Sequence, residues 1–172
     1  MIAKVCGLTA RTDLAGLADL PVDWGGFIFV RSSPRYAGRV PLVLPGSIRA
    51  FGVFRDEPVH SILRTARAWS LGGVQLHGDE PAEDARALKG AGLVVVKAIG
   101  LSGDGGTGLT RASAYGSDDV DYLLFDTPGG GRGGRSTGGC STPTAARCPS
   151  CSPAASVPTV VPASPTFAIR VG

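Results

Sequence analysis

Two side chains that can exchange protons stand at the ends of short apolar runs far apart in the sequence. Cys6 closes a run near the N-terminus, and Asp126 ends the run that begins at Asp121. A thiol and a carboxyl group can act together as general base and general acid. Barrel enzymes place such groups at the carboxyl ends of parallel strands. Cys6 and Asp126 are therefore candidates for a pair of proton-transfer groups.

Four further polar residues are candidates for the same site. Arg35 lies in a predicted loop at the same face of the fold. Gln75 and His77 alternate onto one side of a predicted strand, where they could line a pocket. Lys4 shares the side of the strand that carries Cys6 and is expected inside the barrel.

Each candidate also has a purely structural interpretation. A lone cysteine in an apolar strand is usually a core residue, and an aspartate at a strand end often caps the next helix. Arg35 could be a solvated loop arginine and Lys4 an ordinary lysine of the barrel interior. Gln75 and His77 could form a hydrogen-bonded core pair. The residue types alone leave these alternatives open.

Strand-length runs rich in Val, Ile, Phe and Leu precede residue 128. They are Ile2–Leu8, Gly25–Val30, Ala50–Phe54, Gly73–His77, Leu93–Ile99 and Asp121–Asp126. Such near-continuous apolar strands indicate a parallel sheet that is buried on both faces. Strand and helix alternate about every 20–25 residues, which indicates right-handed βαβ units. The predicted fold class is α/β, and six such units favour a barrel over an open sheet.

Helical patterns lie between several of these strands. One helix is predicted from Asp56 to a stop at Gly72-Gly73, with one apolar face, and another from Asp79 to Gly90. Thr12-Asp13 is expected to cap a first helix that ends near residue 21. The prolines of 41–46 leave little room for a helix, and 101–117 is expected to open as a flexible loop.

Residues 128–172 differ in composition from the rest of the chain. The net charge is +3, but residues 1–127 hold 13 of the 17 Lys and Arg and all 14 acids, giving −1, whereas 128–172 hold four Arg and give +4. The basic balance therefore indicates no nucleic-acid surface on the folded part. Richness in Gly, Pro and Ser predicts a disordered tail at 128–172, after a barrel portion at 1–127. A shift of reading frame would also produce this composition.

Several classes of protein are not expected. No run of about 18 apolar residues occurs, so no membrane span is predicted. No basic leader precedes an apolar stretch, which makes the cytoplasm the expected location. Cys6 stands apart from Cys140, Cys148 and Cys151, so no disulfide framework is indicated. The pair Cys148 and Cys151 has no partners for a zinc site, and no metal is predicted.

Four motifs, in chain order, resemble those of phosphoribosylanthranilate isomerases. They are Lys4-Val5-Cys6-Gly7, Gly26-Phe27-Ile28-Phe29 with Ser33-Pro34-Arg35-Tyr36, Val74-Gln75-Leu76-His77-Gly78, and Leu124-Phe125-Asp126-Thr127. The resemblance covers roughly residues 1–131. It implies a (β/α)8 TIM barrel and a cytoplasmic isomerase of tryptophan biosynthesis. Such an enzyme takes a small phosphoribosyl substrate and needs no cofactor, membrane or nucleic acid.

The resemblance also implies a reaction and a role for each candidate. The reaction is the Amadori rearrangement of N-(5-phosphoribosyl)anthranilate to 1-(2-carboxyphenylamino)-1-deoxyribulose 5-phosphate. Asp126 would be the general acid that protonates the ring oxygen, and Cys6 the general base that takes the proton from C2. Arg35 would bind the anthranilate carboxylate, to which a planar guanidinium is suited. The remaining substrate-binding residues would be Gly7, Gln75 and His77.

The last quarter of the chain departs from the family pattern. The family has two more strands, whose Gly-rich ends hold the substrate phosphate. Here Gly129–Gly134 begins in that style, but only Phe167–Val171 could form a further strand. An alternative hypothesis is therefore an inactive, truncated or frame-disrupted product. A third is the histidine-pathway ProFAR isomerase, whose chemistry usually pairs two aspartates, so Cys6 argues against it. The oligomeric state is not determined by the sequence.

Overall fold

The predicted strands are all present in one sheet. The computed structural model describes residues 2–9, 14, 16–17, 19–38, 41–46, 48–100, 106–126 and 167–170. The strands are β1 (Lys4–Cys6), β2 (Trp24–Ile28), β3 (Arg49–Phe54), β4 (Gly73–Leu76), β5 (Val94–Gly100), β6 (Tyr122–Asp126) and β7 (Phe167–Arg170). From β1 to β6 each strand pairs in parallel with the next one in the chain.

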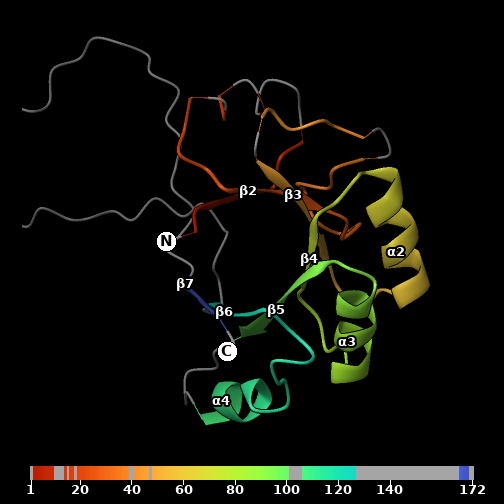
Figure 1. The fold of residues 1–172 in the computed structure, drawn as a ribbon, viewed down its shortest axis with the longest axis vertical. Helices are drawn as coiled ribbons and strands as arrows, with labels where there is room; N and C mark the ends of the chain where they lie inside the picture. Colours follow the sequence, from red (N-terminus) through yellow and green to blue (C-terminus); the bar gives the residue numbers. More distant parts are fainter. Residues whose placement is uncertain are drawn as a thin grey trace, which may run out of the picture.

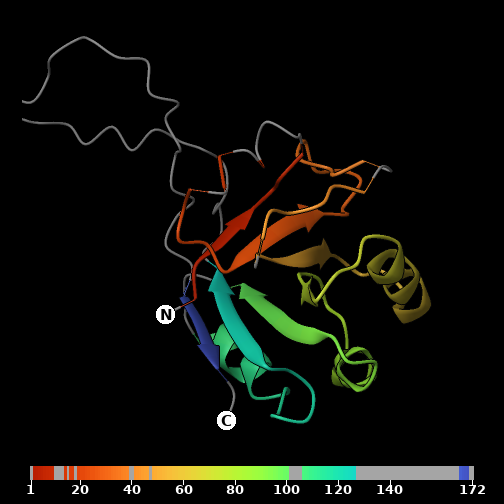
Figure 2. The same ribbon diagram turned by 45° about the horizontal axis from the view of Figure 1, so that its top comes forward.

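This strand order is that of a (β/α) barrel. A doubly wound sheet would reverse its order at a switch point, whereas here the order runs without a break from β1 to β7. The strands follow one another around a curve, and α2 (Val59–Ala68) and α3 (Ala82–Gly90) lie on its outer side (Figures 1 and 2). The prediction of a parallel α/β barrel portion is therefore confirmed for six strands.

The seventh strand runs the other way. β7 pairs antiparallel with β6, with Tyr122 opposite Arg170. The predicted short strand near the C-terminus is thus present, although a seventh strand of a (β/α)8 barrel would be parallel. Among the described residues, β1 and β7 are the two edge strands of the sheet. Residues 127–166 lie outside the described residues, so the boundary at residue 127 and the disordered or frame-shifted tail stay predictions.

The helices correct the sequence-based expectations at two places. α2 ends at Ala68 rather than at Gly72-Gly73, because Ser70 adopts a positive φ of 50° and the Leu71 N–H donates to the Ala66 carbonyl. A short helix, α4 (Gly106–Ala112), follows β5 in the stretch expected as a loop. No helix that the structure describes is long and apolar enough to cross a membrane.

The end of α3 and the absence of a helix in the described residues of 29–48 agree with the sequence. α3 ends at Gly90 as predicted, and the left-handed residue that stops it is Gly92. The described residues of 29–48 contain no helix, in agreement with the prolines there. The expected cap Thr12-Asp13 and the Gly-rich start of the loop at 101–105 lie outside the described residues.

Apolar side chains pack on both faces of the sheet because its strands are almost continuously apolar. One cluster, including Phe27, Val74 and Val95, fills the space between the sheet and its helices. The other lies on the inner face, where the Trp24 ring stacks on Phe51 with centroids 4.3 Å apart and meets Tyr122 edge-on at 5.2 Å. Trp24 is on β2 and Tyr122 on β6, so this contact requires the sheet to curl.

A buried ion pair fastens the loops at the carboxyl ends of the strands. Lys97 Nζ on β5 lies 2.7 Å from Glu80 Oε2, and only 1% and 2% of these two side chains are exposed. The Glu80 carboxylate also accepts the backbone N–H groups of Asp56 and Gly78, and Lys97 donates to the Gly78 carbonyl. The pair therefore joins the loop after β3, the loop after β4, and β5.

Replacing Lys97 by Met should destabilise the fold strongly. The substitution leaves the Glu80 carboxylate buried without its counter-charge, which typically costs about 3–5 kcal/mol. The control is Arg55→Met, which removes an exposed arginine 3.8 Å from the Asp56 carboxylate and should cost at most about 1 kcal/mol. Urea unfolding followed by tryptophan fluorescence measures both changes. Equal losses in the two variants would contradict a dominant role for the buried pair.

Candidate functional site

The alternation of side chains along parallel strands brings five of the candidates to one concave face. Lys4 and Cys6 of β1 point to the inner face because Val5 between them packs in the outer cluster. The same alternation on β4 directs Gln75 and His77 inward, because Val74 and Leu76 belong to the outer cluster. On β6, Leu124 of the inner cluster sets the direction of Asp126.

Four of these side chains form a polar row across the inner face, composed of Lys4, Gln75, His77 and Asp126. The Lys4 Nζ donates to Gln75 Oε1. The Gln75 Nε2 lies 3.3 Å from His77 Nδ1, and the His77 Nε2 lies 3.6 Å from Asp126 Oδ2. The row therefore connects β1, which carries Cys6, with the carboxyl end of β6.

Burial changes the proton affinity of two members of the polar row. Burial lowers the pKa of Lys4, and the neighbouring Cys6 opposes this shift. Burial also lowers the pKa of His77, although 43% of its side chain is exposed, and the Asp126 carboxylate opposes that shift. Both shifts favour the neutral forms of these groups at a polar site enclosed by apolar packing.

Cys6 and Lys4 meet over a glycine of the neighbouring strand. An added Cβ on Gly26 would lie 2.9 Å from Cys6 Sγ and 3.2 Å from the Cε of Lys4. Gly26 pairs with Cys6 in the register of β1 and β2. The absence of a side chain at position 26 is therefore what gives the thiol and the lysine stem their room.

Arg35 reaches the site from the loop after β2. Its Nη1 donates to the carbonyl oxygen of Cys6 at 3.4 Å, and the rest of the exposed guanidinium can receive a carboxylate. Gly7 has a φ of +90°, and a Cβ there would lie 2.8 Å from Arg35 Cδ. Gly7 therefore permits the turn after β1 and the passage of Arg35 across it.

Sequence reasoning missed the buried pair of Glu80 and Lys97, which holds the loops at the carboxyl ends of β3 and β4. The signal was present, because a lysine inside the apolar run of β5 must find an acceptor when the strand is buried. Tyr115 was also missed, and its hydroxyl donates to the Glu80 carbonyl. None of these three residues is a candidate for chemistry, but they hold the segment that follows His77.

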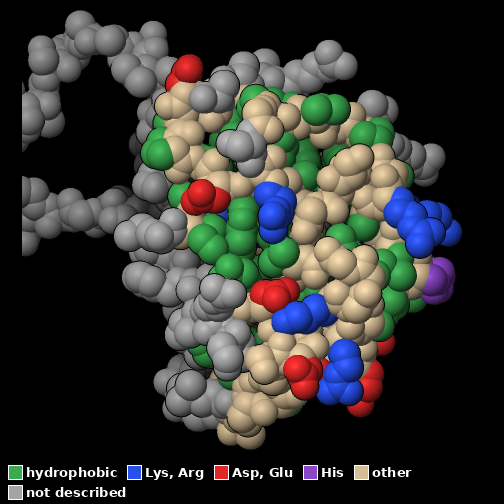
Figure 3. Space-filling view, viewed as in Figure 1, with side chains coloured by type: hydrophobic (Ala, Val, Ile, Leu, Met, Phe, Trp, Pro, Cys, Tyr) green, Lys and Arg blue, Asp and Glu red, His purple; other side chains and the backbone are tan. Residues whose placement is uncertain are grey.

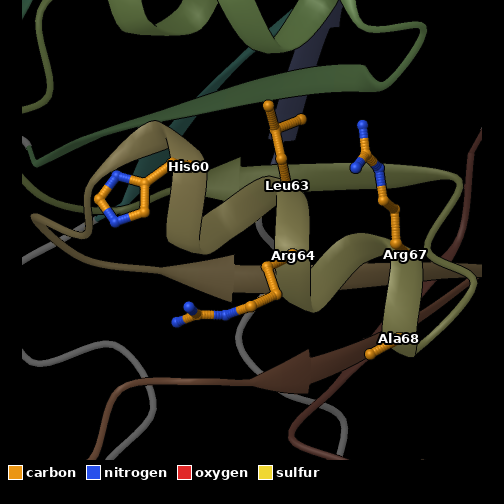
Figure 4. A pocket seen from close by; sticks show the side chains of 5 residues that line it. All are labelled: His60, Leu63, Arg64, Arg67 and Ala68. Carbon is orange, nitrogen blue, oxygen red and sulfur yellow. The ribbon is translucent and has the colours of Figure 1, made fainter.

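Two pockets of the described residues lie outside the polar row, and one of them is lined by Leu14, Pro41, Leu42 and Val43. The other pocket is lined by His60, Leu63, Arg64, Arg67 and Ala68, all of which are on α2 (Figure 4). On the face that Figure 3 shows, basic and acidic side chains of the described residues are interspersed rather than gathered into one basic patch. The described part of the chain holds no cluster of three or more His, Cys, Asp or Glu able to bind a metal.

Comparison with known proteins identifies the family and the fold of this region. Residues 3–136 match the family model of N-(5′-phosphoribosyl)anthranilate (PRA) isomerase. The isomerases of Phocaeicola vulgatus and Rubrobacter xylanophilus are 39% and 36% identical over 134 and 128 residues. These alignments cover 78% and 72% of this chain but 64% and 60% of the relatives. The chain thus spans less than two thirds of their length.

Solved structures agree with these relatives. Phosphoribosylanthranilate isomerase from Thermotoga maritima superposes with a TM-score of 0.64 at 33% identity, covering 74% of this chain and 64% of that one. A second isomerase structure, in complex with reduced 1-(o-carboxyphenylamino)-1-deoxyribulose 5-phosphate, gives 0.62 at 31% identity, covering 75% and 66%.

Replacing Gly26 by Ala should disturb the inner face at Cys6. The new methyl group would clash with Cys6 Sγ, and overpacking of this kind typically costs about 1–3 kcal/mol. Gly100→Ala on β5 is the matched control, because an added Cβ there meets nothing within 4 Å. That change should stay within about 0.5 kcal/mol. Urea unfolding compares the two variants, and a neutral Gly26→Ala would refute the close approach.

Proposed function

Because the chain belongs to the N-(5′-phosphoribosyl)anthranilate isomerase family, we propose that its concave site catalyses the isomerisation of N-(5′-phosphoribosyl)anthranilate in tryptophan biosynthesis. The observation that carries the proposal is the polar row. It runs from the strand of Cys6 to Asp126 at the carboxyl end of β6. A thiol and a carboxyl group on one concave face suit a reaction with two proton transfers.

The proposed roles follow the needs of the reaction. Asp126 donates a proton to the furanose ring oxygen, the C1–O bond breaks, and the anthranilate nitrogen lone pair forms the C1=N bond. The Cys6 thiolate then takes the proton from C2, and the C–H electrons form the C1–C2 double bond as the nitrogen becomes neutral. The resulting enolamine becomes the ketone by protonation at C1 and loss of the O2 proton, with no net change in composition.

Substrate binding is proposed for the other candidates. Arg35 forms a bidentate pair with the anthranilate carboxylate at the mouth of the site, where its side chain is exposed. Gly7 leaves room for that side chain, and Gln75 and His77 line the inner face between acid and base. The proposed roles involve no metal or redox cofactor, because each step of the reaction is a proton transfer with a shift of bonds and no change of overall oxidation state.

Cys6 and Asp126 should each be required for turnover. Cys6→Ser and Asp126→Asn should lower kcat by at least about 100-fold, since each removes one proton-transfer group. His60→Ala, on the outer side of α2, is the control and should leave turnover unchanged. The purified full chain is assayed for conversion of the substrate, and its gene is tested for rescue of a tryptophan auxotroph. No turnover and no rescue by the unsubstituted chain would sink the proposal in favour of an inactive product.

Arg35 should act mainly on substrate binding. Arg35→Lys keeps the charge but loses the planar fork, so KM should rise by about tenfold while kcat changes less. Steady-state kinetics separate the two parameters. A fall in kcat alone would show that Arg35 does not bind the ground-state carboxylate.

A further inference from the structure

The hydrogen bonds of the polar row have directions that chemistry dictates. The Lys4 Nζ donates to the carbonyl oxygen of the Gln75 amide, the end of that amide that can accept a hydrogen bond. The amide nitrogen of Gln75 then points the other way, toward His77 Nδ1 at 3.3 Å. The orientation of the Gln75 amide is therefore set by Lys4 from the opposite strand.

This orientation decides where the imidazole proton sits. The Gln75 Nε2 carries only donors, so the His77 Nδ1 that faces it must be the acceptor and must lack a proton. In a neutral imidazole the proton is then on Nε2. That nitrogen faces Asp126 Oδ2 at 3.6 Å, which is longer than a formed hydrogen bond and suits a contact that tightens when substrate binds.

We infer that Lys4 and Gln75 are positioning residues that hold His77 in its Nε2–H tautomer, so that one N–H is aimed at the Asp126 carboxyl group. Three strands contribute, because Lys4 comes from β1, Gln75 from β4 and Asp126 from β6. The tautomer itself depends only on the described geometry, whereas its consequence for catalysis rests on the proposed function of Asp126.

The charges around His77 are compatible with a neutral ring. Asp126 faces it from β6 and Glu80 from the loop after β4, and both favour the imidazolium. Lys4 from β1 and Lys97 from β5 oppose it, as does burial, which is the largest effect and lowers the pKa of His77. An imidazolium would also direct its Nδ1–H against the amide protons of Gln75. Neutral His77 is thus the state that fits the polar row.

The fixed N–H has a defined effect on the proposed acid. When this contact tightens on substrate binding, the N–H occupies Oδ2 of Asp126 and orients the carboxyl group, which leaves Oδ1 to carry the proton toward the ring oxygen. A histidine in the other tautomer would present a lone pair to Oδ2 and would compete for that proton. Lys4 and Gln75 would thereby influence the acid without touching the substrate.

Nitrogen-15 NMR of the full chain tests the tautomer directly, because the chain has only two histidines. A protonated and an unprotonated ring nitrogen resonate far apart, and a His60→Gln variant assigns the His77 signals. We expect His77 to show a proton on Nε2 and none on Nδ1 near neutral pH. A wild-type His77 that carries its proton on Nδ1, or that populates both tautomers equally, would overturn the inference.

Substitutions in the polar row should move the His77 signals in defined directions. Gln75→Glu replaces the amide donor by an acceptor of the same shape, so the proton should move to Nδ1 and the titration midpoint of His77 should rise by about one pH unit. Lys4→Met should mix the tautomers, and Lys4→Arg, which also only donates, should preserve the wild-type pattern. An unchanged pattern in both Gln75→Glu and Lys4→Met would refute the mechanism.

Two controls separate this role from a merely structural one and from the proposed activity. Lys89→Met removes a lysine from α3 on the outer side of the sheet and should leave the His77 pattern unchanged. The His60 signals report on general damage within each sample. If Gln75→Glu fails to fold, the wild-type spectrum and Lys4→Met still decide. No measurement here requires turnover, so an inactive chain would refute the proposed function and leave the tautomer result standing.

Discussion

Trp24 lies on the concave side of the sheet, and the curvature it maintains is the constraint on which the site depends. Its ring packs against Phe51 of the next strand and against Tyr122, four strands further along the sheet. The contact with Tyr122 can exist only in a curled sheet, since strands four positions apart in a flat one are far from each other. The same curl turns the inner faces of β1, β4 and β6 toward one space. Cys6 and Asp126 share that face for this reason.

Lys97 and Lys4 are both largely buried, and each finds a different kind of hydrogen-bond acceptor. A buried ammonium group needs acceptors. Lys97 obtains a carboxylate and a carbonyl, which makes a rigid tie between the loops that follow β3 and β4. Lys4 donates to the amide oxygen of Gln75 and lies 5.9 Å from the centroid of the Phe51 ring, so among the described residues its effect is to orient the amide rather than to pair with a carboxylate. Lys97 thus holds the loops after β3 and β4 together, and Lys4 sets the direction of the hydrogen bonds in the polar row.

The part of the barrel in this chain carries the proposed acid and base but covers only 64% of the length of the Phocaeicola vulgatus relative. At the outer side of β6, the antiparallel strand β7 takes the hydrogen-bonding positions that a parallel seventh strand would use. Pairing protects an otherwise open edge. In the proposed reaction, binding energy from a remote phosphate would help position the reacting carbon atoms.

The sequence alone determined the six parallel strands and the candidate pair, because local apolar runs and the motifs around Cys6 and Asp126 are readable without tertiary contacts. It misplaced the end of α2, since a left-handed serine at position 70 has no local sequence signature. Only the tertiary structure decided that Lys4 bonds to Gln75 and that Lys97 pairs with Glu80. Those partners come from other strands and loops, which are distant in the sequence. They meet only when the strands have paired and side-chain packing across the strands has curled the sheet.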